Sequence, residues 1–295
     1  MRKFTMLLAF LFVARTGFTQ NLDSLVQSRH PDSLAGKIRT YYTPGKENVA
    51  ARLQSLATAV ANYYEKLFGT PFKVKLAVLD SANWPNEMAP YGIIFSHRGW
   101  IFMHSGMSFE SFQNVYGMQN FQDVTQKALH TKKASGKQMV ESFLEFYTAH
   151  ELGHYFFNSL SGAKYPDFFT NEWMASYFAY QYFKKNKPSI LPAFDLFCQL
   201  YRDNIKPNHT SVESFNSNWG NDGIPTYGWY HVNFYFLCKD MWSCAGERLI
   251  PQYITAFPKT ASQKLSPDGI VKKLELCTSV LNNFEAKLNS KLIND

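Results

Sequence analysis

Two histidines and a glutamate share the spacing of a metal-binding motif. His150, Glu151 and His154 fit the pattern H-E-x-x-H. On a helix, residues four apart lie on one face, about 6 Å apart along the axis, so both imidazoles can bind one zinc ion at Zn–N distances of about 2.0–2.1 Å. Glu151 lies at the flank of this face, where its carboxylate can reach a water molecule on the metal. We therefore expect His150 and His154 to bind zinc and Glu151 to act as a general base.

The simpler interpretation of this stretch is an amphipathic helix with two surface histidines. The neighbouring residues argue against it, because apolar side chains occur around much of the expected helix. Histidines among them are expected in or beside the core, where two neutral imidazoles without partners carry a free-energy cost. A shared metal ion removes that cost. The apolar positions are Phe143, Leu144, Tyr147, Leu152, Tyr155 and Phe156.

Two carboxylates downstream are candidates for the third ligand. A metzincin-type extension is excluded, because it requires Gly at position 157 and His or Asp at position 160, where this chain has Phe157 and Leu160. Asp167 is one remaining candidate. Glu172 is the better one, because residues 170–180 are predicted to form a second helix.

The position of Glu172 at the start of this second helix favours it as a ligand. Thr170 or Asn171 is expected to be the N-cap, which places Glu172 in the first turn. If the second helix packs antiparallel to the first, this carboxylate faces back toward the two histidines. The intervening residues 159–169 contain Gly and Pro and are long enough for the reversal.

The two segments together resemble the gluzincin metallopeptidases. The H-E-x-x-H motif ends at His154, and seventeen residues separate it from Glu172. Asn171-Glu172-Trp-Met-Ala-Ser-Tyr177 is similar to the N-E-G-F-A-S-Y segment of the M1 aminopeptidase group, with Trp and Met in place of Gly and Phe. Ser176 stands where the thermolysin group commonly has Asp. The G-x-M-E-N motif of the M1 group is missing, so the resemblance does not support exopeptidase action.

The resemblance implies a zinc-dependent enzyme that hydrolyses peptide or amide bonds in a peptide or protein substrate. His150, His154 and Glu172 would hold one zinc ion. Glu151 would take a proton from the attacking water and pass it to the leaving amine.

By the same resemblance, a Tyr or His from a later helix should stabilise the oxyanion of the tetrahedral intermediate. Residues 227–231 lie at a suitable distance beyond Glu172 and contain three such side chains, Tyr227, Tyr230 and His231. We expect Tyr230 or His231 to take this role.

Hydrophobic periodicity predicts an α+β fold in which a small sheet precedes a mainly helical part. The apolar spacing predicts a helix over residues 47–68, a strand over 72–79, and a hairpin of 92–95 and 99–104 that turns at 96–99. The resemblance implies a zincin-like architecture, in which the strand around residues 101–105 is the sheet edge that pairs with the substrate backbone. Further helices are expected over residues 190–204, 227–244, 247–257 and 269–288.

The chain is expected to form one domain over residues 21–295, because no stretch has the composition of an interdomain linker. Within it we expect an α+β lobe over residues 21–158, which includes the H-E-x-x-H helix, and a helical lobe over residues 159–295. The zinc ion would lie between the two lobes.

Residues 1–20 have the pattern of a secretory signal peptide, with a basic start, a short apolar run and small or polar residues near the end. The apolar run is too short for a transmembrane helix, so we expect export to a periplasm or secretion. Removing Arg2, Lys3 and Arg15 with this segment lowers the net charge from +7 by three, to +4. The remaining lysines are scattered, which gives no indication of a nucleic-acid partner.

Four cysteines occur in the second half of the chain, and in an exported protein an even number permits disulfides. All three pairings are open, although Cys238 and Cys244 lie on different faces if their helix is continuous. The cysteines are Cys198, Cys238, Cys244 and Cys277.

Two other functions are compatible with the sequence. The chain could be a catalytically silent zincin-fold binding or scaffold protein that keeps its metal for stability, although such a protein has no use for Glu151 as a base. Alternatively, the helical half could be a partner-binding module attached to a vestigial enzyme lobe.

Overall fold

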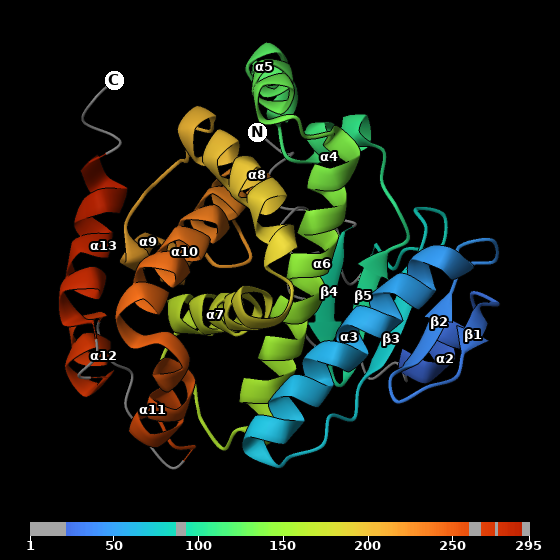
Figure 1. The fold of residues 1–295 in the computed structure, drawn as a ribbon, viewed down its shortest axis with the longest axis horizontal. Helices are drawn as coiled ribbons and strands as arrows, with labels where there is room; N and C mark the ends of the chain where they lie inside the picture. Colours follow the sequence, from blue (N-terminus) through green and yellow to red (C-terminus); the bar gives the residue numbers. More distant parts are fainter. Residues whose placement is uncertain (1–21, 87–92, 260–266, 275–276, 291–295) are drawn as a thin grey trace, which may run out of the picture.

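A computed structural model describes residues 22–86, 93–259, 267–274 and 277–290 (Figure 1). The expected signal segment, residues 1–20, lies outside these ranges. The described chain has an α+β fold, with a small sheet in its N-terminal part and helices after it. The longer helices are α3 (Glu47–Phe68), α5 (Gln122–Lys132), α6 (Gly136–Tyr155), α7 (Phe168–Asn186), α8 (Leu191–Asn204), α10 (Ile224–Ala245) and α13 (Thr278–Ser290). The shorter ones are α2 (Leu22–Gln27), α4 (Phe109–Val115), α9 (Val212–Asn218), α11 (Leu249–Ala256) and α12 (Pro267–Leu274).

The sheet has five strands in the order β1-β2-β3-β5-β4. β2 and β5 both pair parallel with β3, while β1 and β4 are added antiparallel at the two edges. The expectation that the strand around residues 101–105 forms the sheet edge is therefore wrong, because β5 has hydrogen-bonded neighbours on both sides. The edge on that side is β4. The strands are β1 (Asp32–Leu34), β2 (Arg39–Tyr42), β3 (Lys75–Leu79), β4 (Ile94–His97) and β5 (Trp100–His104).

The predicted hairpin is present, but its turn is shorter than expected. Only Arg98 and Gly99 lie between β4 and β5, with φ angles of 46° and 80°. Positive φ at both central residues is the requirement of a two-residue type I′ turn, which matches the twist of the flanking strands. Ser96 therefore belongs to the edge strand rather than to the turn.

The two faces of the sheet pack against different helices. On one face, α3 and α6 cover side chains such as Leu76 and Met103. On the other face, α2 covers Trp100 and Phe102. The side chains of β4 alternate between these two faces. Phe95 stacks on Phe102, on the face that α2 covers, and the next residue, Ser96, points to the side of α6.

The predicted helix over residues 47–68 is confirmed as α3, which ends at Gly69 in the left-handed conformation. The second motif helix begins earlier than expected. Its N-cap is Asp167, whose side chain accepts a hydrogen bond from the Thr170 N–H at 2.8 Å, so the assignment of the cap to Thr170 or Asn171 is wrong. The helix expected over residues 269–288 is instead two helices, α12 and α13.

One disulfide joins the last turn of α10 to the start of α13. It links Cys244 to Cys277, while Cys198 and Cys238 are buried free thiols. Among the residues described, no helix combines the length and the apolar character that crossing a bilayer requires.

Candidate metal centre

Three helices bring the candidate ligands together in the interior. α7 lies between α6 and α10 (Figure 1). A capping box of Ser135 and Gln138 starts α6, whose last turns carry the H-E-x-x-H motif. The close crossing of α6 and α7 depends on Gly153, because a Cβ there would lie 3.0 Å from the Cα and the carbonyl oxygen of Ala175.

Both histidines of the motif face Glu172. The Oε2 atom of Glu172 lies 3.3 Å from His150 Nε2 and 3.2 Å from His154 Nε2. His150 and Glu172 are fully enclosed, whereas the His154 side chain is 13% exposed. Of these three side chains, His154 is the most exposed.

The remaining ring nitrogens of the two histidines have their own partners on α7. Ser176 Oγ lies 3.1 Å from His150 Nδ1, and Asn171 Oδ1 lies 3.0 Å from His154 Nδ1. An amide oxygen only accepts hydrogen bonds, so the Nδ1–H of His154 donates to it. These contacts orient both rings and direct their Nε2 atoms toward Glu172.

Glu172 and His154 have strongly shifted, mutually dependent ionisation. Burial alone would lower the pKa of His154, but the adjacent Glu172 carboxylate raises it to about 9. Burial alone would raise the pKa of Glu172, but the charge of His154 and hydrogen bonds from His150 and His154 hold it well below its usual value. Without a metal, the two side chains form a buried ion pair.

His150 and His231 remain neutral near pH 7. Burial and the charge of His154 lower the pKa of His150 to about 4. Burial lowers the pKa of His231 to about 3, against the opposing effect of Glu172. His231 Nε2 lies 3.7 Å from Glu172 Oε2, and neither ring nitrogen of His231 has a hydrogen-bond partner among the described residues.

Glu151 is buried beside the ligands and is held by the sheet edge. Ser96 of β4 donates a hydrogen bond of 2.5 Å from its Oγ to Glu151 Oε2. Burial raises the pKa of Glu151, while the charge of His154 and the Ser96 hydrogen bond act in the opposite direction. One carboxylate oxygen is thus engaged by Ser96, which fixes the orientation of the group.

Histidine and glutamate donors at these distances could hold a metal ion such as zinc. A tetrahedral site with bonds of about 2.0–2.1 Å separates its ligand atoms by about 3.3 Å, and both imidazole-to-carboxylate distances agree with that value. Among the described residues, two groups have ligand atoms that all lie within 4.8 Å of one another: His150, Glu151 and His154, and His150, Glu172 and His231. The ring nitrogens of the buried His231 have no hydrogen-bond partner among the described residues, so a group bound at the site could satisfy one of them.

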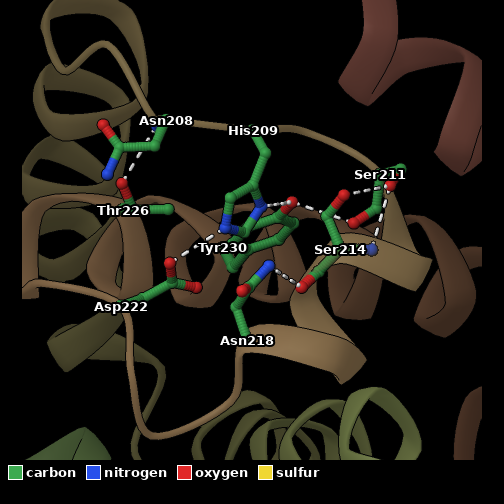
Figure 2. Close-up of polar contacts among 8 residues, drawn as sticks. All are labelled: Asn208, His209, Ser211, Ser214, Asn218, Asp222, Thr226 and Tyr230. Carbon is green, nitrogen blue, oxygen red and sulfur yellow. Dashed lines mark hydrogen bonds and ion pairs between the residues drawn. The ribbon is translucent and has the colours of Figure 1, made fainter.

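Tyr230 lies elsewhere. Its hydroxyl donates to the Ser211 carbonyl at 2.9 Å and lies 2.9 Å from His209 Nδ1, while His209 Nε2 lies 2.9 Å from Asp222 Oδ1. Figure 2 shows this cluster, which connects the loops around α9 to α10. Of the two residues proposed for the oxyanion, the structure brings His231 to the ligands and engages the Tyr230 hydroxyl in a separate polar network.

The alternative ligand Asp167 is also used differently. One of its carboxylate oxygens caps α7, and the other accepts a hydrogen bond from Asn216 of α9 at 3.0 Å. The ring centroids of Tyr227 and His231 lie 4.3 Å apart. Tyr227 therefore packs against His231.

Sequence reasoning missed the role of Ser96 and the orienting contacts of Asn171 and Ser176. The residues around Ser96 do not indicate its role, because Ser96 and Glu151 are 55 positions apart in the sequence. Ser176 had one signal, since it occupies the position at which the thermolysin group commonly has Asp. Asn171 lies within the motif itself, but its expected role was a helix cap.

Comparison with known protein families finds no family that matches this chain, and comparison with curated proteins finds no match either.

Proposed function

We propose that the protein is a zinc-dependent metallopeptidase with a zincin-like fold, exported from the cell. The observation that carries this proposal is the convergence of His150 Nε2 and His154 Nε2 on Glu172 Oε2, with Glu151 beside them. A purely structural metal site needs no additional buried carboxylate, whereas hydrolysis needs a base. The Cys244–Cys277 disulfide supports export, because disulfides persist in oxidising compartments.

Different residues of the chain would have different roles in peptide hydrolysis. His150, His154 and Glu172 would hold the zinc, which when bound lowers the pKa of a coordinated water and polarises the scissile carbonyl. Glu151, oriented by Ser96, accepts a proton from the attacking water through its second oxygen and delivers it to the leaving amine.

His231 is the residue suited to the oxyanion. It is neutral near pH 7, so one ring nitrogen carries a hydrogen that it can donate to developing negative charge. Its buried position, 3.7 Å from Glu172, places that hydrogen beside the ligands.

The test is cleavage of a mixed peptide library by the zinc-loaded protein, with Glu151→Gln as the matched variant. We expect the wild type to cut peptides and Glu151→Gln to lose at least 100-fold of the activity, because a general base contributes roughly 10²–10⁴-fold, while its zinc content stays the same. If both proteins hold zinc and neither cuts, the proposal fails in favour of a silent binding protein. If neither holds zinc, the metal site itself is wrong.

A further inference from the structure

One histidine connects the two loops around α9 to α10. His209 Nε2 lies 2.9 Å from Asp222 Oδ1, and His209 Nδ1 lies 2.9 Å from the Tyr230 hydroxyl (Figure 2). That hydroxyl lies 2.9 Å from the carbonyl oxygen of Ser211, which is the N-cap residue of α9. His209 therefore belongs to a chain of polar groups that starts at the carboxylate of Asp222 and ends at the carbonyl of Ser211.

The Tyr230 hydroxyl has one hydrogen and two neighbours that can accept it. A carbonyl oxygen only accepts, so the contact with Ser211 is a hydrogen bond only when the hydroxyl donates to it. The hydroxyl oxygen must then accept from His209, and Nδ1 carries a hydrogen. Nε2 also carries a hydrogen, because the Asp222 carboxylate only accepts. All three hydrogen bonds are thus present together only when the His209 ring is doubly protonated.

The neutral ring requires a different arrangement of the same groups. Nδ1 without its hydrogen is an acceptor, and the Tyr230 hydroxyl donates to it by rotating about its C–O bond. The hydroxyl then no longer donates to the Ser211 carbonyl, whose remaining partner among the described residues is the Phe215 N–H at 3.1 Å. The proton on His209 therefore decides whether the start of α9 is hydrogen-bonded to α10.

The surroundings of the ring allow it to exchange a proton with solvent. The His209 side chain is 21% exposed, whereas that of Asp222 is 7% exposed. Asp222 faces the ring from the loop between α9 and α10, and Tyr230 faces it from α10. The other charged side chains nearest in sequence are Lys206, in the same loop as His209, and Glu213, which is exposed on α9. Histidine is the side chain whose charge ordinarily changes between about pH 5 and 8.

α9 is also held by a helix of the candidate metal centre. Asn216 accepts a hydrogen bond from the Phe169 N–H of α7 at 2.8 Å and donates one to Asp167 Oδ2 at 3.0 Å. α9 therefore bridges α7, which carries Glu172, and α10, which carries His231. The contact at the N-terminal end of α9 is the part of this bridge that a proton can control.

We propose that His209, Tyr230 and Ser211 form a pH-dependent switch, which holds α9 to α10 when the His209 ring is protonated and releases this contact when the ring is neutral. Between the two states one proton leaves Nδ1 for solvent, and the Tyr230 hydroxyl turns from Ser211 to Nδ1. The N–H bond is the one covalent bond that changes. The switch is independent of the proposed peptidase function, because it involves neither metal nor substrate.

The first test follows the two ring nitrogens by NMR between about pH 5 and 9. The His209 signals are those that are missing from His209→Gln. We expect both nitrogens to be protonated at the acid end. As the pH rises, Nδ1 should lose its hydrogen while Nε2 keeps the one that it donates to Asp222. A ring that does not titrate in this range, or that loses the hydrogen from Nε2 instead, overturns the switch.

The second test measures, by urea unfolding at each pH, what the Tyr230 hydroxyl contributes to stability. In the protonated state this hydroxyl makes one hydrogen bond more than in the neutral state, so Tyr230→Phe should raise the unfolding equilibrium constant more at the acid end. The excess should be about 2- to 10-fold, the effect of one net hydrogen bond, and should disappear at the pH where His209 titrates. The comparison cancels the titration of His154, because the wild type and the variant share it.

Two histidine variants are the controls. In a His209→Gln background the effect of Tyr230→Phe should not depend on pH, because a Gln side chain does not titrate. His130 is exposed on α5, and in the matched variant His130→Gln the pH dependence should be that of the wild type. A Tyr230→Phe effect that is equal at both ends of the pH range in the wild-type background, or that depends on pH in the His209→Gln background, overturns the switch.

Discussion

At the scale of single residues, the candidate centre is defined by one carboxylate oxygen that two imidazoles share. Glu172 Oε2 accepts from both histidines, and Asn171 and Ser176 hold the opposite sides of the two rings. Such outer contacts orient metal ligands and strengthen metal binding. The Ser176 hydroxyl thus performs an orienting role without the charge that an Asp would bring.

Zinc binding should release a proton from His154. The pKa of His154 in the metal-free protein is raised to about 9, so near pH 7 this ring carries a proton that zinc must displace. We expect about one proton released per zinc at pH 7, and an affinity that rises with pH until about 9 and then levels off. Calorimetric titration in buffers of different ionisation enthalpy measures the proton directly.

The raised pKa of His154 also makes the stability of the metal-free fold depend on pH. Because the folded pKa of His154 is above its ordinary value of 6.5, its contribution to stability is fully present below pH 6.5 and is lost as the pH rises through about 9. A proton count of zero at pH 7, with stability flat between pH 7 and 9, would contradict the buried ion pair of His154 and Glu172.

Removing the Ser96 hydroxyl should slow turnover without weakening zinc binding. Ser96 donates to Glu151, and a hydrogen bond to a charged group contributes about 1.5–3 kcal/mol. We expect Ser96→Ala to lower kcat about 10- to 100-fold with KM and zinc content nearly unchanged. Ser96→Thr keeps the hydroxyl and suits a strand, so it should restore most of the rate. Equal rates for Ser96→Ala and the wild type would show that Ser96 does not orient the base.

At the scale of elements, the centre depends on how closely α6 and α7 cross. Gly153 lies within the motif and lets the α7 backbone approach at Ala175. This crossing places Asn171, Glu172 and Ser176 against the motif histidines.

Gly153→Ala should therefore damage both stability and metal binding. Alanine in a helix gains up to about 1 kcal/mol over glycine, but the added Cβ would lie 3.0 Å from backbone atoms that cannot move without shifting α7. Overpacking costs about 1–3 kcal/mol, so we expect a net loss of about 1 kcal/mol in urea unfolding and weaker zinc binding in a chelator competition. A more stable variant with unchanged zinc affinity would show that α6 and α7 can accommodate the added methyl group where they cross.

At the scale of the whole molecule, one hydrophobic cluster extends from the sheet through α3, α6 and α7 to α13. The last helices join this cluster at the end of the chain, and the disulfide connects α13 to α10. The candidate metal centre therefore lies within a continuous core rather than on a separable module.

Removing the disulfide should destabilise the fold but leave the metal site intact. Cys244 and Cys277 are 33 residues apart, and closing a loop of that length stabilises a protein by about 3–4 kcal/mol in the chain-entropy description. We expect the double variant Cys244→Ser/Cys277→Ser to lose stability of this order in urea unfolding while it binds zinc normally. A reducing agent should shift the wild-type midpoint and leave the variant's midpoint unchanged. An unaffected wild type would show that the bond does not constrain the chain.

The sequence by itself determined the local parts of this protein. The i, i+4 spacing of His150 and His154 placed both rings on one helix face, and Glu172 near the start of the next helix was the natural partner, although α7 begins at Phe168 and Glu172 therefore lies beyond its first turn. The limits of α3 followed from its apolar period and from Gly69. Each of these follows from the geometry of a few neighbouring residues, which the sequence states directly.

Only the tertiary structure decided the contacts between distant segments. It made β4 the edge strand, brought Ser96 to Glu151, and paired Cys244 with Cys277. It also separated Tyr230 from His231, since successive helix residues point about 100° apart and only one of them can face Glu172. Strand order, helix rotation and disulfide pairing depend on packing between residues far apart in the chain, which local periodicity does not encode.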